Sequence, residues 1–224
     1  MNSLLKGSVL LALFGLTLAA CSPSSATKPA PSSASPTADK QMMDHSHMGS
    51  MGDSMGSMSL GPADTEFDLR FIDAMTPHHK GAVEMAQDAL QKSQRPQIKQ
   101  LAQAIIADQN REINQLKQWR QAWYPNVGST PVAYSSQMGH TMPMSQEQMQ
   151  SMMMNGDLGP ANAQYDLRFI NLMLPHHEGA VVMAQEALSK SQRPEVKRLA
   201  QSIIASQQRE INQMKQWRQQ WYGQ

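Results

Sequence analysis

The feature that most constrains the fold of this chain is an internal duplication. Residues 67–124 align with residues 165–222 with 42 identities and 16 differences over 58 positions. In both copies apolar residues recur at steps of three and four, which is the pattern of an amphipathic α-helix. A short Ser-Gln-Arg-Pro break divides each copy into two such helices, and so short a connection indicates an antiparallel hairpin. Each copy is therefore predicted to form one helical hairpin.

Two hairpins that each expose an apolar face are expected to pack against each other. We predict an all-α fold, a four-helix bundle built from two duplicated antiparallel helical hairpins at residues 62–125 and 161–224. Residues 126–160 form the crossover linker between them. Identical hairpins could instead pair between two molecules, so a homodimer stays open as an alternative.

Local signals refine this picture. Asp64 is predicted to cap the first helix, and Pro96 suits the first turn of the second helix. Pro77 lies within the first helix, where it either kinks the helix or marks the start of a new one. In the crossover linker, Ser145 with Gln148 could cap a further short helix.

The first 20 residues have the layout of a signal peptide. Lys6 precedes an apolar run that is too short for a stable membrane-spanning helix. The run ends in Leu-Ala-Ala-Cys, which resembles a bacterial lipobox and predicts cleavage before Cys21 and lipidation of its thiol. An ordinary signal peptide cut nearby is the alternative. Residues 21–61 would then tether an exported protein to lipid, on the periplasmic face of the outer membrane if the cell has two membranes, and otherwise on the cell surface.

The duplicated helix carries a Pro-His-His motif inside its apolar stripe. On a helical wheel with about 100° per residue, His79 falls at the centre of the stripe, and Gln109 and Glu112 fall inside the stripe of the following helix. Antiparallel pairing should bring these polar residues into neighbouring core layers. A buried carboxylate without a partner would cost several kcal/mol, so either a histidine or a metal ion is expected to satisfy it. The second copy supplies the equivalent residues His177, Gln207 and Glu210.

His78 is predicted to lie at the edge of the same stripe, close to Met75 and Met85. These three side chains could face one metal ion, and the second copy repeats them as Met173, His176 and Met183. The alternative is structural: His79 and Glu112 would form a buried hydrogen-bonded pair, and the methionines would only fill the core. The first histidine of each pair is the better candidate ligand.

Two further segments concentrate methionine and histidine outside the hairpins. The chain has 19 methionines and one cysteine. Glycines interrupt the first segment, so a methionine stripe facing a core does not explain it. An inert low-complexity linker is the alternative. The candidate ligands in the two segments are His45, His47, Met48 and Met51, and then His140, Met142 and Met144.

The donor types favour copper. Thioether and imidazole without thiolate suit Cu(I), with Cu(II) tolerated where histidine dominates. Zinc would require more cysteine, histidine or carboxylate, and a di-iron centre would require a Glu-x-x-His motif that is missing after Glu112 and Glu210. The net charge of +1 argues against a nucleic-acid partner.

The spaced residues of the two copies resemble the DUF305 family. The resemblance rests on Phe-Ile-x-x-Met-x-Pro-His-His-x-x-Ala-x-x-Met-Ala from Phe71, and on Leu-Ala-x-x-Ile-Ile-x-x-Gln-x-x-Glu-Ile from Leu101. It implies a ferritin-like helical bundle. Because tandem exported members include copper-binding proteins, it also implies copper binding through methionine and histidine in copper tolerance or buffering.

Together these observations predict a non-enzymatic extracytoplasmic lipoprotein that buffers or sequesters copper. A metal-dependent oxidase and a metal-free helical adaptor are the alternatives. No nucleophile constellation or cofactor fingerprint supports an enzyme. The sequence does not identify a copper pump or chaperone that would exchange copper with the protein.

Overall fold

The computed structural model describes residues 59–224. The signal peptide, Cys21 and the first methionine-rich segment with His45, His47, Met48 and Met51 lie outside the described residues.

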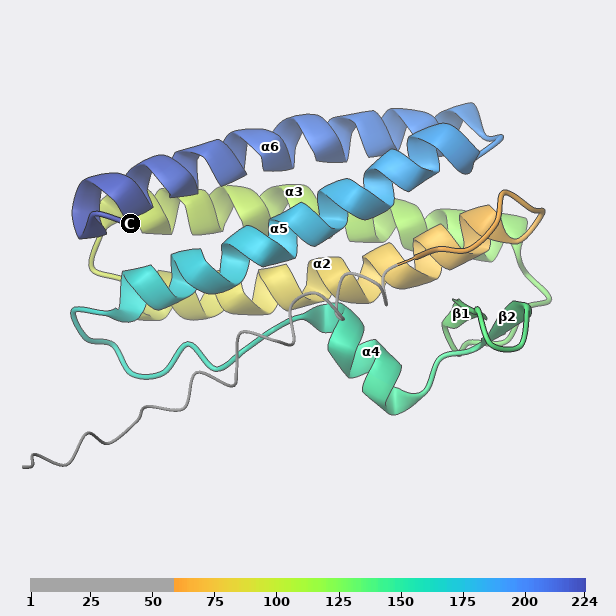
Figure 1. The fold of residues 1–224 in the computed structure, drawn as a ribbon, viewed down its shortest axis with the longest axis horizontal. Helices are drawn as coiled ribbons and strands as arrows, with labels where there is room; N and C mark the ends of the chain where they lie inside the picture. Colours follow the sequence, from red (N-terminus) through yellow and green to blue (C-terminus); the bar gives the residue numbers. More distant parts are fainter. Residues whose placement is uncertain (1–58) are drawn as a thin grey trace, which may run out of the picture. The chain divides into compact units, whose positions relative to one another are not determined.

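The described chain folds mainly into helices. Two long antiparallel hairpins lie side by side, and they meet where α2 packs against α5 (Figure 1). This confirms the predicted all-α bundle of two duplicated hairpins. The four long helices are α2 (Phe67–Lys92), α3 (Pro96–Trp123), α5 (Tyr165–Lys190) and α6 (Pro194–Tyr222).

The start of α2 differs from the prediction. The helix begins at Phe67, and Glu66 occupies its N-cap position without a capping side-chain hydrogen bond. Asp64 instead accepts a 2.9 Å hydrogen bond from the Glu66 backbone N–H and forms a 2.9 Å ion pair with Arg70. The predicted Asp64 cap was therefore wrong, because a buried arginine one turn into the helix draws this carboxylate away. Pro77 lies within an unbroken helix, so it does not start a new one.

Two apolar clusters form the core, and each combines opposite halves of the two repeats. One cluster joins the C-terminal half of α2 to the N-terminal half of α5, and the other joins the remaining halves. Because α2 and α5 run antiparallel, the middle of one helix crosses the middle of the other. The duplicated Pro-His-His motif lies at this crossing.

The crossover linker is more ordered than its composition indicates. Strands β1 (Val132–Ser135) and β2 (His140–Pro143) form an antiparallel hairpin in which Val132 pairs with Pro143. The short helix α4 (Gln146–Met153) follows and carries the predicted Ser145–Gln148 capping box. Both β1 and α4 pack against α2.

The strands were not predicted because their support comes from the bundle. The Val132 backbone N–H donates a 2.9 Å hydrogen bond to Asp73, and Arg70 donates a 2.8 Å hydrogen bond to Thr141. The residues of the two strands do not predict either contact, because both partners belong to α2. Within residues 59–224, none of the helices combines the length and the apolar character needed to cross a bilayer.

Candidate metal centre

Four histidines meet in the centre of the bundle. His78 and His176, which are 98 residues apart, stack with ring centroids 3.8 Å apart and planes tilted by 45°. His79 and His177 lie next to them, with centroid distances of 6.5 Å from His78 and 6.1 Å from His176. All four side chains are 0% exposed. We call these residues, together with Gln109, Glu112, Gln207 and Glu210, the histidine layer.

A carboxylate faces the second histidine of each motif. His79 Nε2 lies 2.8 Å from Glu112 Oε2, and His177 Nε2 lies 2.7 Å from Glu210 Oε2. The contact between His177 and Glu210 is a hydrogen bond. The contact between His79 and Glu112 has the distance of an ion pair, but its atoms are not aligned for a hydrogen bond. Each histidine thus lies beside the glutamate with which helical periodicity predicted it to share the core.

The first histidine of each motif has different surroundings in the two repeats. His176 Nε2 lies 3.0 Å from the His78 carbonyl oxygen and 3.2 Å from the Met153 carbonyl oxygen, so it donates to this pair. Neither ring nitrogen of His78 has a hydrogen-bond partner among the described residues. The Met153 carbonyl was not predicted as part of the site, and no sequence signal marked it.

Buried lone pairs are the layer's main chemical property. Nδ1 is without a hydrogen-bond partner in all four histidines of residues 59–224, as are both side-chain amide atoms of Gln109 and Gln207. An unpaired buried polar atom costs roughly 1–3 kcal/mol, so native proteins keep few of them. A cluster of this size in one layer indicates a place for a ligand that accepts nitrogen lone pairs.

Burial also keeps the first histidines neutral. Desolvation, reinforced by repulsion from His176, His79 and His177, lowers the pKa of His78 well below its ordinary value. Desolvation and the neighbouring histidines lower the pKa of His176 to about 3. A proton therefore does not compete for these nitrogens at neutral or mildly acidic pH.

The structure corrects the predicted position of His78 and His176. They do not lie at an accessible edge, because the edge of one hairpin is covered by the other hairpin. A helical wheel describes one helix and does not show how two hairpins cover each other, although their packing into one bundle was predicted.

The methionines also group differently from the prediction. Met75 and Met183 belong to one apolar cluster, and Met85 and Met173 belong to the other. The two clusters lie on opposite sides of the histidine layer, so Met75 and Met85 do not gather around one point with His78. All four thioethers are at most 2% exposed. Each side of the layer therefore has one motif methionine from each repeat.

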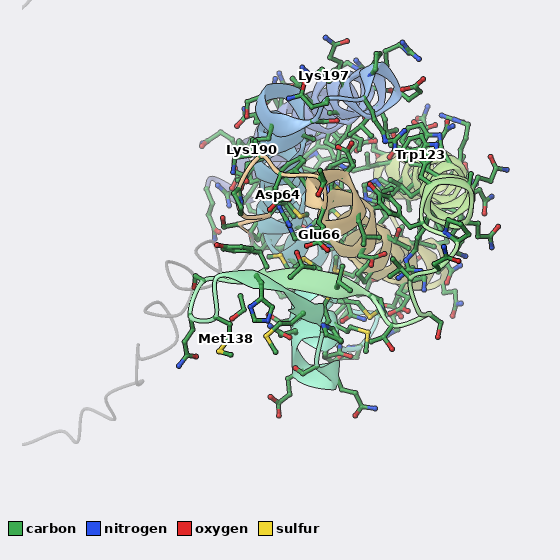
Figure 2. The ribbon with its side chains drawn as sticks, turned by 90° about the vertical axis from the view of Figure 1, so that its right-hand side faces the viewer. Asp64, Glu66, Trp123, Met138, Lys190 and Lys197 are labelled. Atoms are coloured by element: carbon green, nitrogen blue, oxygen red, sulfur yellow. The ribbon has the colours of Figure 1, made fainter. Side chains whose placement is uncertain are left out.

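The predicted ligands of the crossover linker lie apart from the layer. His140 is exposed on β2, and its Nδ1 lies 3.0 Å from the Met138 carbonyl oxygen. Met142 is 38% exposed, and Figure 2 shows Met138 at the outer turn of the β-hairpin. Met144 is buried in the same apolar cluster as Met75 and Met183.

Carboxylate, histidine and cysteine side chains alone do not make a ready metal site here. Within the described part of the chain, no three such side chains are arranged to hold one metal ion. The other donors next to the layer are the thioethers of Met75, Met85, Met173 and Met183.

Comparison with known proteins identifies relatives with the same architecture. The sequence profile of DUF305, a domain of unknown function, matches residues 18–120 and 68–218. The solved structure of CopM in the Cu(II)-bound form is 43% identical with a TM-score of 0.55, and the match covers 69% of this chain and 97% of that one. CopM in the Cu(I)-bound form is 42% identical with a TM-score of 0.54 over the same shares.

A third structure, a DUF305 fragment from Deinococcus radiodurans, is 30% identical with a TM-score of 0.54, over 69% of this chain and 95% of the fragment. An uncharacterized protein of Acanthamoeba polyphaga mimivirus is 43% identical over 49 residues, which are 22% of this chain and 32% of the viral protein. The chain thus matches about a third of that protein's length.

Proposed function

We propose that this chain, which belongs to the DUF305 family, binds copper at the histidine layer through imidazole nitrogen and methionine sulfur. The observation that carries the proposal is the set of four buried, unpaired Nδ1 atoms at the crossing of α2 and α5. Within residues 59–224 none of these four atoms has a hydrogen-bond partner.

The carboxylates support this role for His79 and His177. Histidines that bind metal usually donate their other ring N–H to a carboxylate or carbonyl, which fixes the tautomer and turns the free nitrogen toward the ion. Glu210 accepts such a bond of 2.7 Å from His177, and Glu112 Oε2 lies 2.8 Å from His79 Nε2. In this arrangement Nδ1 is the free atom.

The surrounding donors favour Cu(I) over harder ions. Thioether sulfur and neutral imidazole are soft or borderline ligands, and Cu(I) accepts both. The four motif methionines are buried in the apolar clusters on either side of the layer, within one or two helical turns of the histidines in sequence. Cu(II) could occupy positions with more nitrogen.

The relatives support the same ion. CopM has been solved in Cu(I)-bound, Cu(II)-bound and Ag-bound forms, and Ag(I) is a common substitute for Cu(I) because both are soft monovalent ions. The match with the copper-bound forms, at 42–43% identity, covers 69% of this chain and 97% of CopM.

The proposed role is copper buffering or sequestration outside the cytoplasm, with the protein attached to the membrane by a lipid at Cys21. The exposed ligands His140 and Met142, with the upstream segment around His45 and Met48, would bind copper weakly and release it fast. The buried layer would hold it more tightly.

Titration of the purified mature chain with Cu(I) against a competing chelator tests the proposal. We expect more than one equivalent to bind, with a tight class that is lost when His78, His79, His176 and His177 are all replaced by glutamine. A matched control replaces His140 and Met142 and should retain the tight class. Absence of copper uptake by the natural chain would refute the proposal.

A further inference from the structure

Methionines also gather between α2 and the crossover linker. Helix α4 and strand β1 both pack against α2 on the same side of the bundle (Figure 1). Residues of all three elements line a cavity of about 140 Å³, which is large enough for a metal ion or for several water molecules. The methionines in its lining are Met144, Met152 and Met154.

These three methionines come from two different parts of the linker. Met144 follows β2, where its backbone N–H donates a 2.7 Å hydrogen bond to the Pro131 carbonyl, and it is only 4% exposed. Met152 lies in the last turn of α4, and Met154 occupies the C-cap position of that helix. Both are half-buried, so part of the cavity lining is in contact with solvent.

Met154 has an unusual backbone conformation. With a φ of 45° and a ψ of 29°, it is the only non-glycine residue with positive φ within residues 59–224. Helices that end in this left-handed conformation usually have glycine or asparagine there, because a β-carbon is crowded in it. Asn155 comes only one position later. The chain therefore keeps a methionine in the cavity lining although its backbone conformation is costly, and such positions often have a function.

The donor atoms of the cavity differ from those of the histidine layer. Within residues 59–224, the cavity lining contains no histidine, carboxylate or cysteine. Thioether sulfur is a soft ligand that selects Cu(I), and Ag(I) resembles Cu(I) in this respect. Zinc prefers thiolate, imidazole or carboxylate. The described lining therefore offers sulfur to a soft monovalent ion and little to zinc.

Arg70 also lines the cavity, and an unpaired guanidinium there would repel a metal cation. Its charge is matched by Asp64, which forms a 2.9 Å ion pair with it. The guanidinium donates its hydrogen bonds to the carbonyl oxygens of Leu60 and Pro62 and to the hydroxyl of Thr141. Arg70 is therefore neutralised by its own partners and does not exclude a monovalent cation from the cavity.

The cavity is a neighbour of the histidine layer. Met153, between the two α4 methionines of the cavity, has its carbonyl oxygen 3.2 Å from His176 Nε2. Met144 belongs to the same apolar cluster as Met75 and Met183, which lie beside the layer. None of the described residues that line the cavity belongs to the layer itself. The two places are therefore adjacent but have separate donor atoms.

We propose that this cavity is a second soft-metal site, in which the thioethers of Met144, Met152 and Met154 bind one Cu(I) ion. The choice of ion rests on the proposed copper-binding function, whereas the ligands and the position are independent of the histidine layer. Two of the three ligands are half-buried, so the site belongs to the more weakly binding class and persists when the histidines of the layer are replaced.

NMR of the full mature chain, labelled with carbon-13 at the methionine methyl groups, tests this site. Ag(I) is added in chloride-free buffer as the substitute for Cu(I) that does not change oxidation state. We expect the methyl signals of Met144, Met152 and Met154 to shift along one common binding curve. Zn(II) at the same concentrations should leave them in place. Signals that stay in place in excess Ag(I), or that move equally with Zn(II), would overturn the proposal.

Leucine substitutions separate metal binding from packing. The double variant Met152→Leu and Met154→Leu nearly conserves side-chain volume, which protein cores tolerate, and should abolish the Ag(I)-dependent shift of Met144. Met149→Leu is the matched control, since of the described α4 methionines Met149 packs against the same apolar cluster without lining the cavity. Circular dichroism verifies that both variants are folded. A Met144 shift that persists in the folded double variant would contradict a shared site.

The same titration distinguishes this site from the histidine layer. If Ag(I) shifts the imidazole nitrogens of the layer and leaves the three methyl signals unchanged, the cavity proposal fails and the proposed function stands. If the methyl signals shift and the nitrogens of the layer do not, copper binding at the layer fails and the cavity site stands.

Discussion

His79 and His177 each face a carboxylate that comes from the next helix, and His177 forms a hydrogen bond with its carboxylate. Both glutamates remain slightly accessible, with side-chain exposures of 10% for Glu112 and 14% for Glu210. The carboxylates therefore keep part of their hydration while they contact a fully buried ring, which limits the desolvation cost of their charge. In both histidines Nε2 faces the carboxylate, and Nδ1 is buried without a hydrogen-bond partner among the described residues.

Removal of one carboxylate charge tests this role. We expect Glu112→Gln to weaken Cu(I) binding by roughly 10–100-fold, the usual effect of losing the partner of a metal-binding histidine. Chelator competition on the mature chain gives the affinity. Glu178→Gln is the matched control, because Glu178 forms a 2.7 Å ion pair with Lys215 at the surface. An unchanged affinity in a folded Glu112→Gln protein would contradict the role.

The neutral histidines also make stability depend on pH. The pKa of His176 is lowered to about 3 in the folded chain, whereas an unfolded histidine has a pKa near 6.5. Between these values unfolding takes up a proton, so the stabilising effect is complete above pH ~6.5 and is lost as pH falls toward the folded pKa. One such group gives a slope of about 1.4 kcal/mol per pH unit.

Urea unfolding of the metal-free chain at several pH values between 6.5 and 4 measures this slope. We expect His176→Gln to lower the slope of unfolding free energy against pH by the contribution of one proton, roughly 1.4 kcal/mol per pH unit. His140→Gln, on the exposed strand, should leave it unchanged. An equal slope in His176→Gln and the natural chain would show that His176 is not kept neutral by burial.

At the scale of elements, the segments before α2 and α5 act as clamps between repeats. Arg70 is 1% exposed and binds Leu60, Pro62, Asp64 and Thr141, so one guanidinium joins α2 to the preceding segment and to the β-hairpin. The fork of five N–H donors suits this task, and lysine could not replace it. Within residues 59–224, the equivalent Arg168 donates hydrogen bonds only to Leu158, Pro160 and Asn162 in the segment before its own helix.

This difference predicts unequal costs for the same substitution. Arg70→Met should lower the free energy of unfolding by about 3–5 kcal/mol, because it removes several charge-assisted hydrogen bonds and leaves buried acceptors unpaired. Arg168→Met should cost less, about 1–3 kcal/mol, because Pro160 and Asn162 are exposed. Urea denaturation of both variants measures the difference. Equal costs would show that the contact between Arg70 and the β-hairpin adds no stability.

At the scale of the whole molecule, duplication is what builds the site. A single hairpin would present His78 and His79 on an open apolar surface. The second copy, packed antiparallel, covers that surface with its own motif and brings two pairs of histidines into one layer. Neither copy alone has the 3.8 Å contact between His78 and His176 on which the centre depends.

The sequence predicted what lies within one hairpin better than what lies between hairpins. The pairing of His79 with Glu112 followed from periodicity, because both residues belong to one hairpin with a short turn. The buried position of His78 and the separation of Met75 from Met85 depend on how α5 crosses α2, and no local pattern encodes that crossing. The strands Val132–Ser135 and His140–Pro143 were missed for the same reason, since Asp73 and Arg70 stabilise them from a distance.

Nitrogen NMR of isotope-labelled histidine during Cu(I) titration of the mature chain tests the central claim most directly. Each imidazole reports separately on Nδ1 and Nε2, so the measurement identifies both the residue and the atom that bind. The account predicts that the first equivalent of Cu(I) shifts Nδ1 of histidines in the buried layer, including His79 or His177, while His140 is unaffected. A first equivalent that shifts His140 and leaves every Nδ1 of the layer unchanged would contradict it.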